Sequence, residues 1–299
     1  MKRRARLAVT LGDPRGIGAE VVRKAVLHPR VIAECEIVLV GASGLEARAD
    51  VSTGDWDGRG SEAAAGRLAG LAIERAVAMA LAGDVNGVVT APIDKHALLA
   101  GGYDFPGHTE MLAALTGAQV AMMLASDRLR VVLATTHIAL RDVPLAVTPD
   151  AISTAARITR TGLIEWFGIA EPRLALCALN PHAGDGGRFG DEDERVLVPV
   201  ARSEGLAGPF AADTVFVRAM RGEFDAVITP YHDVGMTAIK VASFGHAVNV
   251  TLGLPFPRTS PDHGTALDIA GQGKADPESM IHAILLCARV AEGRRQERK

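Results

Sequence analysis

Three histidines of this chain each follow an apolar segment, an arrangement that can build a catalytic metal site. They are His137, His182 and His232, and they follow the segments 131–136, 174–179 and 226–229 respectively. Three neutral imidazoles with an open fourth position suit zinc or a similar divalent ion. The spacing is also compatible with ordinary loop histidines, or with one acid–base histidine and two bystanders, because the three lie far apart in sequence.

The third histidine belongs to the most informative stretch of the chain, which reads DAVITPYHDVGMTAIK at residues 225–240. The segment 226–229 is typical of a buried strand, and Pro230 ends it because proline has no N–H to give to a ladder. Three polar or titratable residues, 231–233, follow at once. Such side chains at the carboxyl end of a buried strand are typical of ligand sites in open α/β sheets.

A second group of residues suits an anion. GHTE at 107–110 follows a proline turn, and Lys240, Asn249 and Arg258 follow strand or turn positions. Lysine and arginine with amide and hydroxyl donors are what a phosphate or a carboxylate needs. The competing interpretation of any single arginine is a solvated side chain. Lysine is scarce in this chain, which draws attention to Lys95 as well as Lys240, although the sequence assigns Lys95 no role.

Short apolar runs alternate with helical patterns along the whole chain. Strands are expected at 7–11, 36–41, 87–90, 131–136, 174–179, 226–229 and 247–252, and a helix from 19 to about 27. Strands separated by helices indicate βαβ units with a mixed, mostly parallel sheet covered on both faces. The predicted fold class is therefore α/β.

Turn and cap residues add detail to this outline. Ser61 can cap a long alanine-rich helix, and Gly83 can stop it. The segment 50–60 is rich in Gly, Asp and Ser and is expected to be a surface loop. The segment 258–260 is expected to lie in a glycine- and proline-bearing loop.

Composition restricts the class of protein. The 299 residues are 48% hydrophobic with a net charge of −3, which indicates a soluble, two-lobed globular chain without a nucleic-acid surface. No window approaches the length of a membrane span. Cys35, Cys177 and Cys287 lie far apart in apolar segments, so we expect reduced core cysteines and a cytoplasmic protein.

The turn at residues 12–18, GDPRGIG, could be mistaken for a dinucleotide-binding fingerprint. It lacks the GxGxxG spacing, and no acidic residue ends a second strand at the required distance, so we reject that interpretation. A glycine-bearing loop that opens a helix can still face an anion or a cofactor.

Residues 263–276 fit the pattern HGTAxDIAGxGxAD, which closely resembles the adenosine-binding loop of isocitrate and isopropylmalate dehydrogenases. Those enzymes hold Mg²⁺ or Mn²⁺ with aspartates and grip the substrate with an arginine cluster, and neither feature is found in this sequence. The wider match is carried, in order, by GDPxGIGxE at 12–20, GHTE at 107–110, ATTHIALRD at 134–142, LNPHAGDGG at 179–187, YHD at 231–233 and VNVTLGLPFPRTSPDHGTA at 248–266. Together these motifs resemble the 4-hydroxythreonine-4-phosphate dehydrogenase family of pyridoxal phosphate synthesis.

This resemblance implies an isopropylmalate-dehydrogenase-like fold of two α/β/α lobes. Residues 1–124 with 245–299 would form the cofactor-binding lobe, and 126–244 the lobe that binds metal and forms the dimer. The resemblance also implies a homodimer with its active site at the subunit interface. In that dimer His137 and His182 would come from one subunit and His232 from its partner.

The resemblance further implies roles for individual residues. The metal, zinc with Co, Mn or Mg as alternatives, would be held by His137, His182 and His232. The substrate would be bound by His108, Thr109, Lys240, Asn249 and Arg258. NAD, with NADP as the alternative, would be bound by Gly12, Asp13, His263, Gly264, Thr265 and Asp268. The general base stays open between Asp233 and Asp213 on chemical grounds and Lys240 by analogy.

The implied reaction is metal-dependent oxidation of 4-phosphooxy-L-threonine to the 3-oxo acid, which loses CO₂ to give 3-amino-2-oxopropyl phosphate. Relatives that oxidise threonate or erythronate 4-phosphate are not separated by these motifs. Two other classes remain in view: a zinc hydrolase or aldolase that uses no nicotinamide, and a non-catalytic sensor of a phosphorylated ligand. The adenosine-type loop disfavours the first, and the three histidines disfavour the second.

Overall fold

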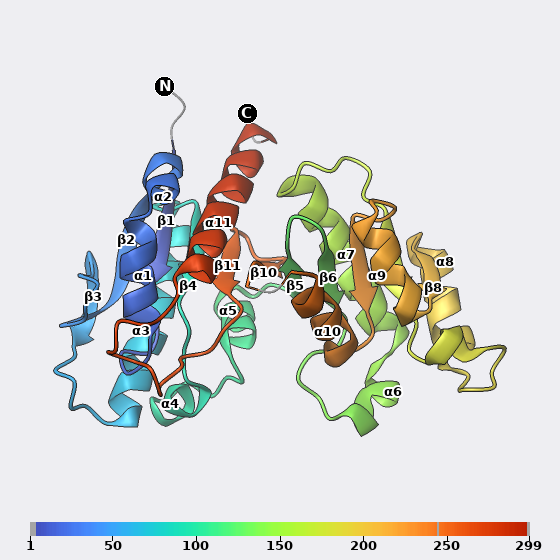
Figure 1. The fold of residues 1–299 in the computed structure, drawn as a ribbon, viewed down its shortest axis with the longest axis horizontal. Helices are drawn as coiled ribbons and strands as arrows, with labels where there is room; N and C mark the ends of the chain where they lie inside the picture. Colours follow the sequence, from blue (N-terminus) through green and yellow to red (C-terminus); the bar gives the residue numbers. More distant parts are fainter. Residues whose placement is uncertain (1–3, 244, 298–299) are drawn as a thin grey trace. The chain divides into compact units, whose positions relative to one another are not determined.

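Parallel strands with helices on both faces form each of the two units into which the chain folds (Figure 1). The structure is a computed structural model and describes residues 4–243 and 245–297. The first unit contains residues up to 118 together with 248–250 and those from 254 onward, and the second contains 119–247 and 251–253. This α/β architecture with a mostly parallel, mixed sheet confirms the predicted fold class.

In the first unit the strand order is β3-β2-β1-β4-β11-β10, and only β10 runs antiparallel to its neighbour β11. The strands are β1 (Ala5–Thr10), β2 (Cys35–Ser43), β3 (Val51–Asp55), β4 (Gly87–Thr90), β10 (Val248–Leu252) and β11 (Arg258–Pro261). The helices are α1 (Gly18–Val26), α2 (Pro29–Glu34), α3 (Glu62–Leu81), α4 (Lys95–Ala100), α5 (His108–Thr116) and α11 (Glu278–Glu297). Helix α11 packs with α1 and α2, and α3 packs with α4 and α5, so two groups of helices cover the sheet.

In the second unit the strand order is β5-β6-β9-β7-β8, and only β5 and β6 are antiparallel. The strands are β5 (Ala121–Ala125), β6 (Arg130–Leu133), β7 (Leu174–Cys177), β8 (Ala207–Phe210) and β9 (Ala226–Thr229). The helices are α6 (Val143–Ala146), α7 (Pro149–Glu165), α8 (Val198–Glu204), α9 (Ala212–Met220) and α10 (His232–Ala242), with short turns η1 (Leu140–Asp142), η2 (Pro181–Gly184) and η3 (Asp193–Leu197). Alternate residues of β6, β7 and β9 pack against α9 and α10, which gives the unit its core.

The predicted strands are all present. The strands 87–90 and 226–229 have the predicted ends, and the ends of the others differ by at most three residues. The caps of the long helix are also as predicted. Ser61 accepts a hydrogen bond from the N–H of Ala64 at 3.2 Å, and Gly83 follows the helix with φ 79°. Strand β5 belongs to the second unit, where it pairs with β6.

Two segments predicted to be loops are strands. β3, within 50–60, pairs only with β2 as an edge strand, so its polar and half-exposed residues do not show the apolar pattern of a buried strand. β11 lies between β4 and β10 although it begins with arginine and ends with proline. The Thr259 hydroxyl explains how a polar strand is tolerated there, because it donates to the carbonyl of Ala283 at 2.8 Å.

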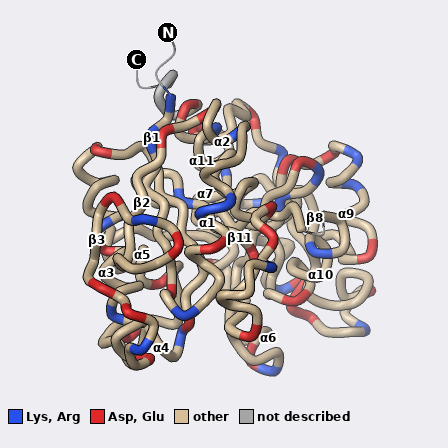
Figure 2. The backbone as a smooth tube through the Cα atoms, turned by 60° about the vertical axis from the view of Figure 1, so that its left-hand side comes forward, with Lys and Arg blue, Asp and Glu red and all other residues tan. Residues whose placement is uncertain are grey.

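Charged residues of both signs are distributed along both units, as expected for a net charge of −3 (Figure 2). Within the described part of the chain, none of the helices combines the length and apolar character that crossing a membrane requires. The three cysteines are buried and unbridged, as the sequence predicts.

Candidate active site

The three histidines follow three neighbouring parallel strands of the second unit. β9 lies between β6 and β7, with Val131 opposite Val227 on one side and Leu174 opposite Ala226 on the other. The carboxyl ends of these strands therefore meet at one edge of the sheet, which is where the sequence predicts the histidines to emerge.

The loops after β6 and β9 are tied together, which brings His137 and His232 close. The hydroxyl of Thr135 donates to the carbonyl of Pro230 at 2.7 Å. Helix α10 can begin at His232 directly over the strands because Gly235 has no side chain. A Cβ at Gly235 would lie 2.7 Å from the Thr229 hydroxyl and within 3 Å of two core side chains.

The rings of His137 and His232 have centroids 5.5 Å apart. His232 Nδ1 lies 2.8 Å from Asp233 Oδ1, and a carboxylate can only accept, so Nδ1 carries the proton and Nε2 is left to bind a ligand. A hollow of about 220 Å³ adjoins both rings and is lined by Thr136, His137, Ile138, Leu140, Val143, Tyr231, His232 and Asp233. Two imidazoles at this separation suit one metal ion with Zn–N distances of about 2 Å.

His182 occupies a strained turn outside that hollow. Three non-glycine residues there have left-handed backbones, namely His182 (φ 54°), Ala183 (φ 55°) and Asp185 (φ 46°). Such residues each cost on the order of 1–3 kcal/mol and cluster at ligand sites. Asp193 supports the turn by accepting backbone N–H bonds from Leu179 and Asn180 at 2.8 and 3.0 Å.

The three imidazoles are not assembled into one site within a single chain. The ring of His182 lies beside Phe189, at 6.5 Å between centroids. Across residues 4–243 and 245–297, no three His, Cys, Asp or Glu side chains are grouped so as to hold a metal. In the described part of the chain, His182 thus lies apart from the pair that His137 and His232 form.

The candidates for the general base are dispersed over the second unit. Asp233 lines the hollow and contacts His232. Asp213 is the second residue of α9 and is exposed, and Lys240 lies two turns after His232 on α10. Neither of these two lines the hollow beside the histidine pair.

The first unit contains a buried cation at the start of β11. Arg258 is 1% exposed, and its Nη2 donates to the hydroxyl of Thr90 on the neighbouring strand β4. Burial lowers the pKa of Arg258 to about 9. An anionic ligand beside this guanidinium would offset the cost of burying its charge.

His108 lies within electrostatic reach of Arg258 at the first turn of α5. Burial, together with the positive charges of Arg258 and Lys95, holds the pKa of His108 well below its usual range. The imidazole is therefore neutral at physiological pH. Its Nε2 is buried without a hydrogen-bond partner, and so is Oδ1 of Asn249 on β10. Two predicted substrate residues of this unit, His108 and Asn249, thus carry buried polar atoms without partners. A third, Thr109, is the second residue of α5.

The two sequence segments predicted to bind the cofactor contact each other in the first unit. The N–H of Ile17 donates to the carbonyl of Thr265 at 2.9 Å. A Cβ at Gly16 would lie 2.8 Å from the same carbonyl oxygen, so glycine permits the close approach. The far end of the 263–276 loop is held by Glu20, which accepts from the N–H of Ala275 at 2.9 Å.

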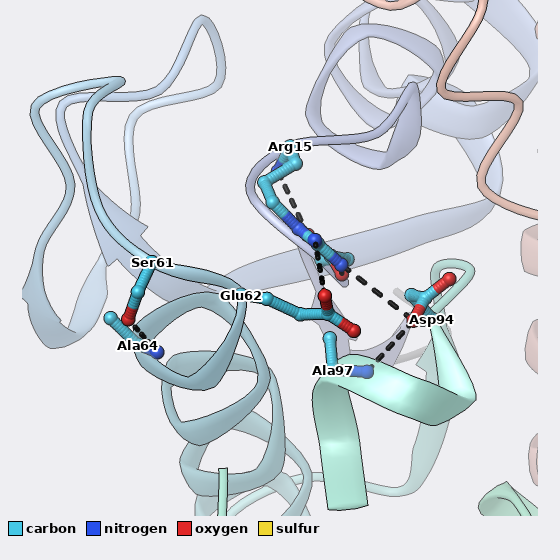
Figure 3. A network of polar contacts seen from close by, with 7 residues as sticks. Arg15, Ser61, Glu62, Ala64, Asp94 and Ala97 are labelled. Carbon is cyan, nitrogen blue, oxygen red and sulfur yellow. Dashed lines mark hydrogen bonds and ion pairs between the residues drawn. The ribbon is translucent and has the colours of Figure 1, made fainter. Parts of the chain in front are cut away.

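Asp13 has a structural role in this loop. Its carboxylate is buried and binds Arg15 through Nε at 3.1 Å and Nη2 at 2.8 Å. Figure 3 shows Arg15 reaching from the loop toward Glu62 and Asp94, at 3.9 and 3.7 Å respectively. Arg15 thereby links the glycine loop to the starts of α3 and α4, and Asp94 also caps α4 through the N–H of Ala97 at 2.8 Å.

A hollow of about 330 Å³ opens beside the same loops, at the lower end of the range usual for ligand pockets. It is lined by Pro14, Arg15, Gly16, Ala19, Glu20, Leu45, Glu46, Trp56, Gly58, Ala270 and Gly271. None of the six predicted cofactor residues is in this lining. Gly12 and Asp13 directly precede its first member, and His263, Gly264, Thr265 and Asp268 belong to the adjoining loop. The sequence did not indicate Trp56, which stands in a segment without a motif. The scarcity of lysine drew attention to Lys95 but assigned it no role.

A model of the family described as pyridoxal phosphate biosynthetic protein PdxA matches residues 33–287. A 4-hydroxythreonine-4-phosphate dehydrogenase from Geobacter metallireducens is 42% identical, over 96% of this chain and 95% of that protein. The solved enzyme of that name from Klebsiella pneumoniae has a TM-score of 0.84 and 35% identity, covering 98% of this chain and all of the other. A terephthalate 1,2-cis-dihydrodiol dehydrogenase from Burkholderia xenovorans has a TM-score of 0.65 and 30% identity, covering 96% and 98% of the two chains.

The fold is shared more distantly with an isocitrate dehydrogenase from Methylococcus capsulatus, at a TM-score of 0.53 and 16% identity, over 98% of this chain and 89% of the other. The fold and the named relatives define an oxidoreductase of the two-unit α/β dehydrogenase class. Within that class, the chain belongs to the PdxA family, that of the 4-hydroxythreonine-4-phosphate dehydrogenases.

Proposed function

We propose that this protein oxidises 4-phosphooxy-L-threonine with NAD⁺ and a divalent metal, giving the 3-oxo acid that decarboxylates to 3-amino-2-oxopropyl phosphate. The match to relatives named for this activity, over 96% of the chain, carries the proposal. Two features of the structure support it independently of the names. These are the paired rings of His137 and His232 and the buried cation Arg258 beside a neutral His108.

The donor set fits a divalent metal. His137 and His232 would supply two nitrogen ligands, and His182 the third, with a second subunit completing the site. The bound cation would supply Lewis-acid chemistry that lowers the pKa of the substrate's secondary hydroxyl. Asp233 holds the His232 ring with Nε2 available as a ligand, so its geometry supports a positioning role. Asp213 and Lys240 stay predictions for the general base.

Residues of the first unit would bind the substrate's anionic groups. Arg258 offers a fixed guanidinium, and the neutral His108 can donate from Nε2 to a phosphate or carboxylate oxygen. Asn249 would use its unpaired Oδ1 to accept from a substrate hydroxyl or ammonium group. Lys240 lies in the second unit, and its role in substrate binding stays a prediction from the family resemblance.

NAD⁺ would accept the hydride, and its adenosine end would lie at the 263–276 loop. Asp268 is exposed on that loop, with its carbonyl rather than its carboxylate bound by Gln272. A carboxylate facing the adenosine ribose accepts from a 2′-hydroxyl and repels a 2′-phosphate. We therefore expect a preference for NAD⁺ over NADP⁺.

Replacing Asp268 with serine should lower the ratio of kcat/KM with NAD⁺ to kcat/KM with NADP⁺ by roughly tenfold, equivalent to about 1.4 kcal/mol. The measurement is kcat/KM with each cofactor for both proteins. Exposed Asp276→Ser, later in the same loop, is the matched control and should leave the ratio unchanged. A wild-type kcat/KM that is higher with NADP⁺ would show that Asp268 does not select the cofactor.

A homodimer is proposed from apolar side chains that are exposed in the segments carrying or following the histidines. Leu145 is 83% exposed on α6, which follows His137, and Val241 is 82% exposed on α10, which begins at His232. Phe189, beside His182, is also exposed. Exposed apolar side chains in the unit that carries the ligand residues are what an interface with a second copy would cover.

Replacing Leu145 with glutamate should shift the protein toward monomers and lower turnover, because a charge would be buried in the dimer. Sedimentation equilibrium over a range of protein concentrations measures the change. Leu27→Glu is the control, since Leu27 is 64% exposed and belongs to the first unit, which does not contain the three histidines. A dimer as stable in Leu145→Glu as in the wild type would contradict this choice of interface.

The function is tested by following NADH formation from NAD⁺ and Zn²⁺ with a panel of substrates. The panel contains 4-phosphooxy-L-threonine, threonate 4-phosphate and erythronate 4-phosphate. It also contains a cis-dihydrodiol carboxylate, because a 30% identical relative is named for such a substrate. The highest kcat/KM should belong to 4-phosphooxy-L-threonine, and the absence of NADH with every compound would contradict the proposal.

A further inference from the structure

We propose that Lys95 is a further substrate-anchoring residue, whose ammonium group binds the substrate phosphate together with Arg258. This inference rests on the proposed function, since it concerns the same anionic substrate. The residues involved, Lys95, Gly107, His108 and Arg258, all belong to the first unit. None of the sequence motifs includes Lys95.

Lys95 lies beside the first turn of α5. Its Cε is 3.8 Å from the place where a Cβ on Gly107, the N-cap residue of that helix, would lie. The positive charge of Lys95, together with that of Arg258, also lowers the pKa of His108, which follows Gly107. The two cations therefore lie near the same imidazole, one from α4 and the other from β11.

The start of α4, which carries Lys95, is held firmly. Asp94 caps the helix through the N–H of Ala97, and Arg15 approaches the same carboxylate at 3.7 Å (Figure 3). Behind it, α4 packs closely on α3, where a Cβ on Gly66 would overlap the carbonyl of Ala97. A fixed helix start limits where the ammonium group can reach and so favours binding at one place over a freely solvated side chain.

Several groups around the first turn of α5 favour an oxyanion, and Glu110 is the carboxylate that lies there with them. The first turn of α5 presents unpaired backbone N–H groups, and the helix dipole adds positive potential. The Nε2 of His108 is buried without a partner and can donate when the ring is neutral. Lys95 and Arg258 add two positive charges, and a phosphate dianion matches two cations better than a carboxylate does.

Glu110 offers the simplest competing role for Lys95. Its Oε2 lies 3.6 Å from where that same Cβ on Gly107 would lie, so it is the nearby carboxylate that a structural lysine would pair with. Within the described ranges 4–243 and 245–297, however, no carboxylate lies within 4.0 Å of Lys95 Nζ, whereas the ion pairs of Arg15 meet that limit. The ammonium group is thus left for a ligand.

The test compares Lys95→Met, Lys95→Arg and the neighbouring control His96→Ala. Losing a charged hydrogen bond to phosphate should raise KM for 4-phosphooxy-L-threonine by roughly tenfold to a hundredfold, with a smaller change in kcat. KM for NAD⁺ should not change. Arginine should restore part of the affinity because it keeps the charge, and His96→Ala should behave as wild type.

Binding of inorganic phosphate, measured by calorimetry without turnover, separates this proposal from the proposed function. The Kd for phosphate should rise in Lys95→Met by a factor similar to that of KM, and the Kd for acetate should not. A wild type that is inactive on every substrate would contradict the function and leave the phosphate measurement valid. Unchanged phosphate affinity in Lys95→Met, weaker acetate binding alone, or the same defect in Glu110→Gln would overturn the assignment of Lys95.

Discussion

Replacing His232 with alanine should abolish turnover and sharply weaken the binding of divalent metal, and His137→Ala and His182→Ala should do the same. A catalytic site with three protein ligands retains two after such a change, and metal affinity falls with the ligand count. The measurements are NADH formation, metal bound per chain after gel filtration, and recovery of chelator-treated wild type with Zn²⁺, Co²⁺ or Mn²⁺.

Two further variants show whether the loss is specific. Asp233→Asn keeps the His232 ring but weakens its orientation, so activity should fall by roughly tenfold to a hundredfold, as is usual for residues that support a metal ligand. His246→Ala removes an exposed histidine of the same unit and should have no effect. Full activity of metal-free wild type would exclude the three-histidine site.

The positions of these histidines could be predicted from the sequence because they depend on strand polarity alone. Residues that follow apolar runs in a parallel sheet must emerge at the same edge, and β6, β9 and β7 are adjacent and parallel. The grouping of the rings was not predictable from spacing. It depends on the hydrogen bond from Thr135 to Pro230 and on the left-handed backbone of His182, which no periodicity reports.

Strand β11, which the sequence predicts to be a loop, shows a different limit of recognising strands from sequence. A buried strand is recognised by apolar side chains, but β11 places Arg258 and Thr259 in the core because each has a specific hydrogen-bond partner. The arginine predicted to lie in a loop is therefore a fixed part of the sheet. This matters for function, since a buried guanidinium is a far more rigid anion anchor than a solvated one.

The surroundings of Lys95 and Trp56 could not be predicted from the sequence, for a related reason. Lys95 lies near His108 because the start of α4 approaches the start of α5. Tertiary packing sets this contact between two short helices. Trp56 lines a hollow with residues from the glycine loop and the 263–276 loop, which are far apart in sequence. Neither environment leaves a local pattern in the chain.

A mixture of two inactive variants should recover activity if the metal site is shared between subunits. When His182→Ala and His232→Ala are refolded together, about half of the dimers are mixed under random pairing. If His182 and His232 of one site come from different subunits, each mixed dimer has one site with both defects and one site that is intact. Activity should therefore return to roughly a quarter of the wild-type value.

The other two mixtures identify the histidine that shares a chain with His137. The family resemblance places His182 with His137, so His137→Ala mixed with His182→Ala should stay inactive, while His137→Ala mixed with His232→Ala should recover. The rings of His137 and His232 lie 5.5 Å apart within one chain, which supports the opposite assignment, with these two ligands from one subunit. In that case His137→Ala mixed with His182→Ala should recover activity, and His137→Ala mixed with His232→Ala should stay inactive. Both assignments require recovery of activity in the first mixture, because in each of them one metal site takes His182 and His232 from different subunits. Failure of all three mixtures, with each variant folded and dimeric, would mean that every site takes its three histidines from a single chain.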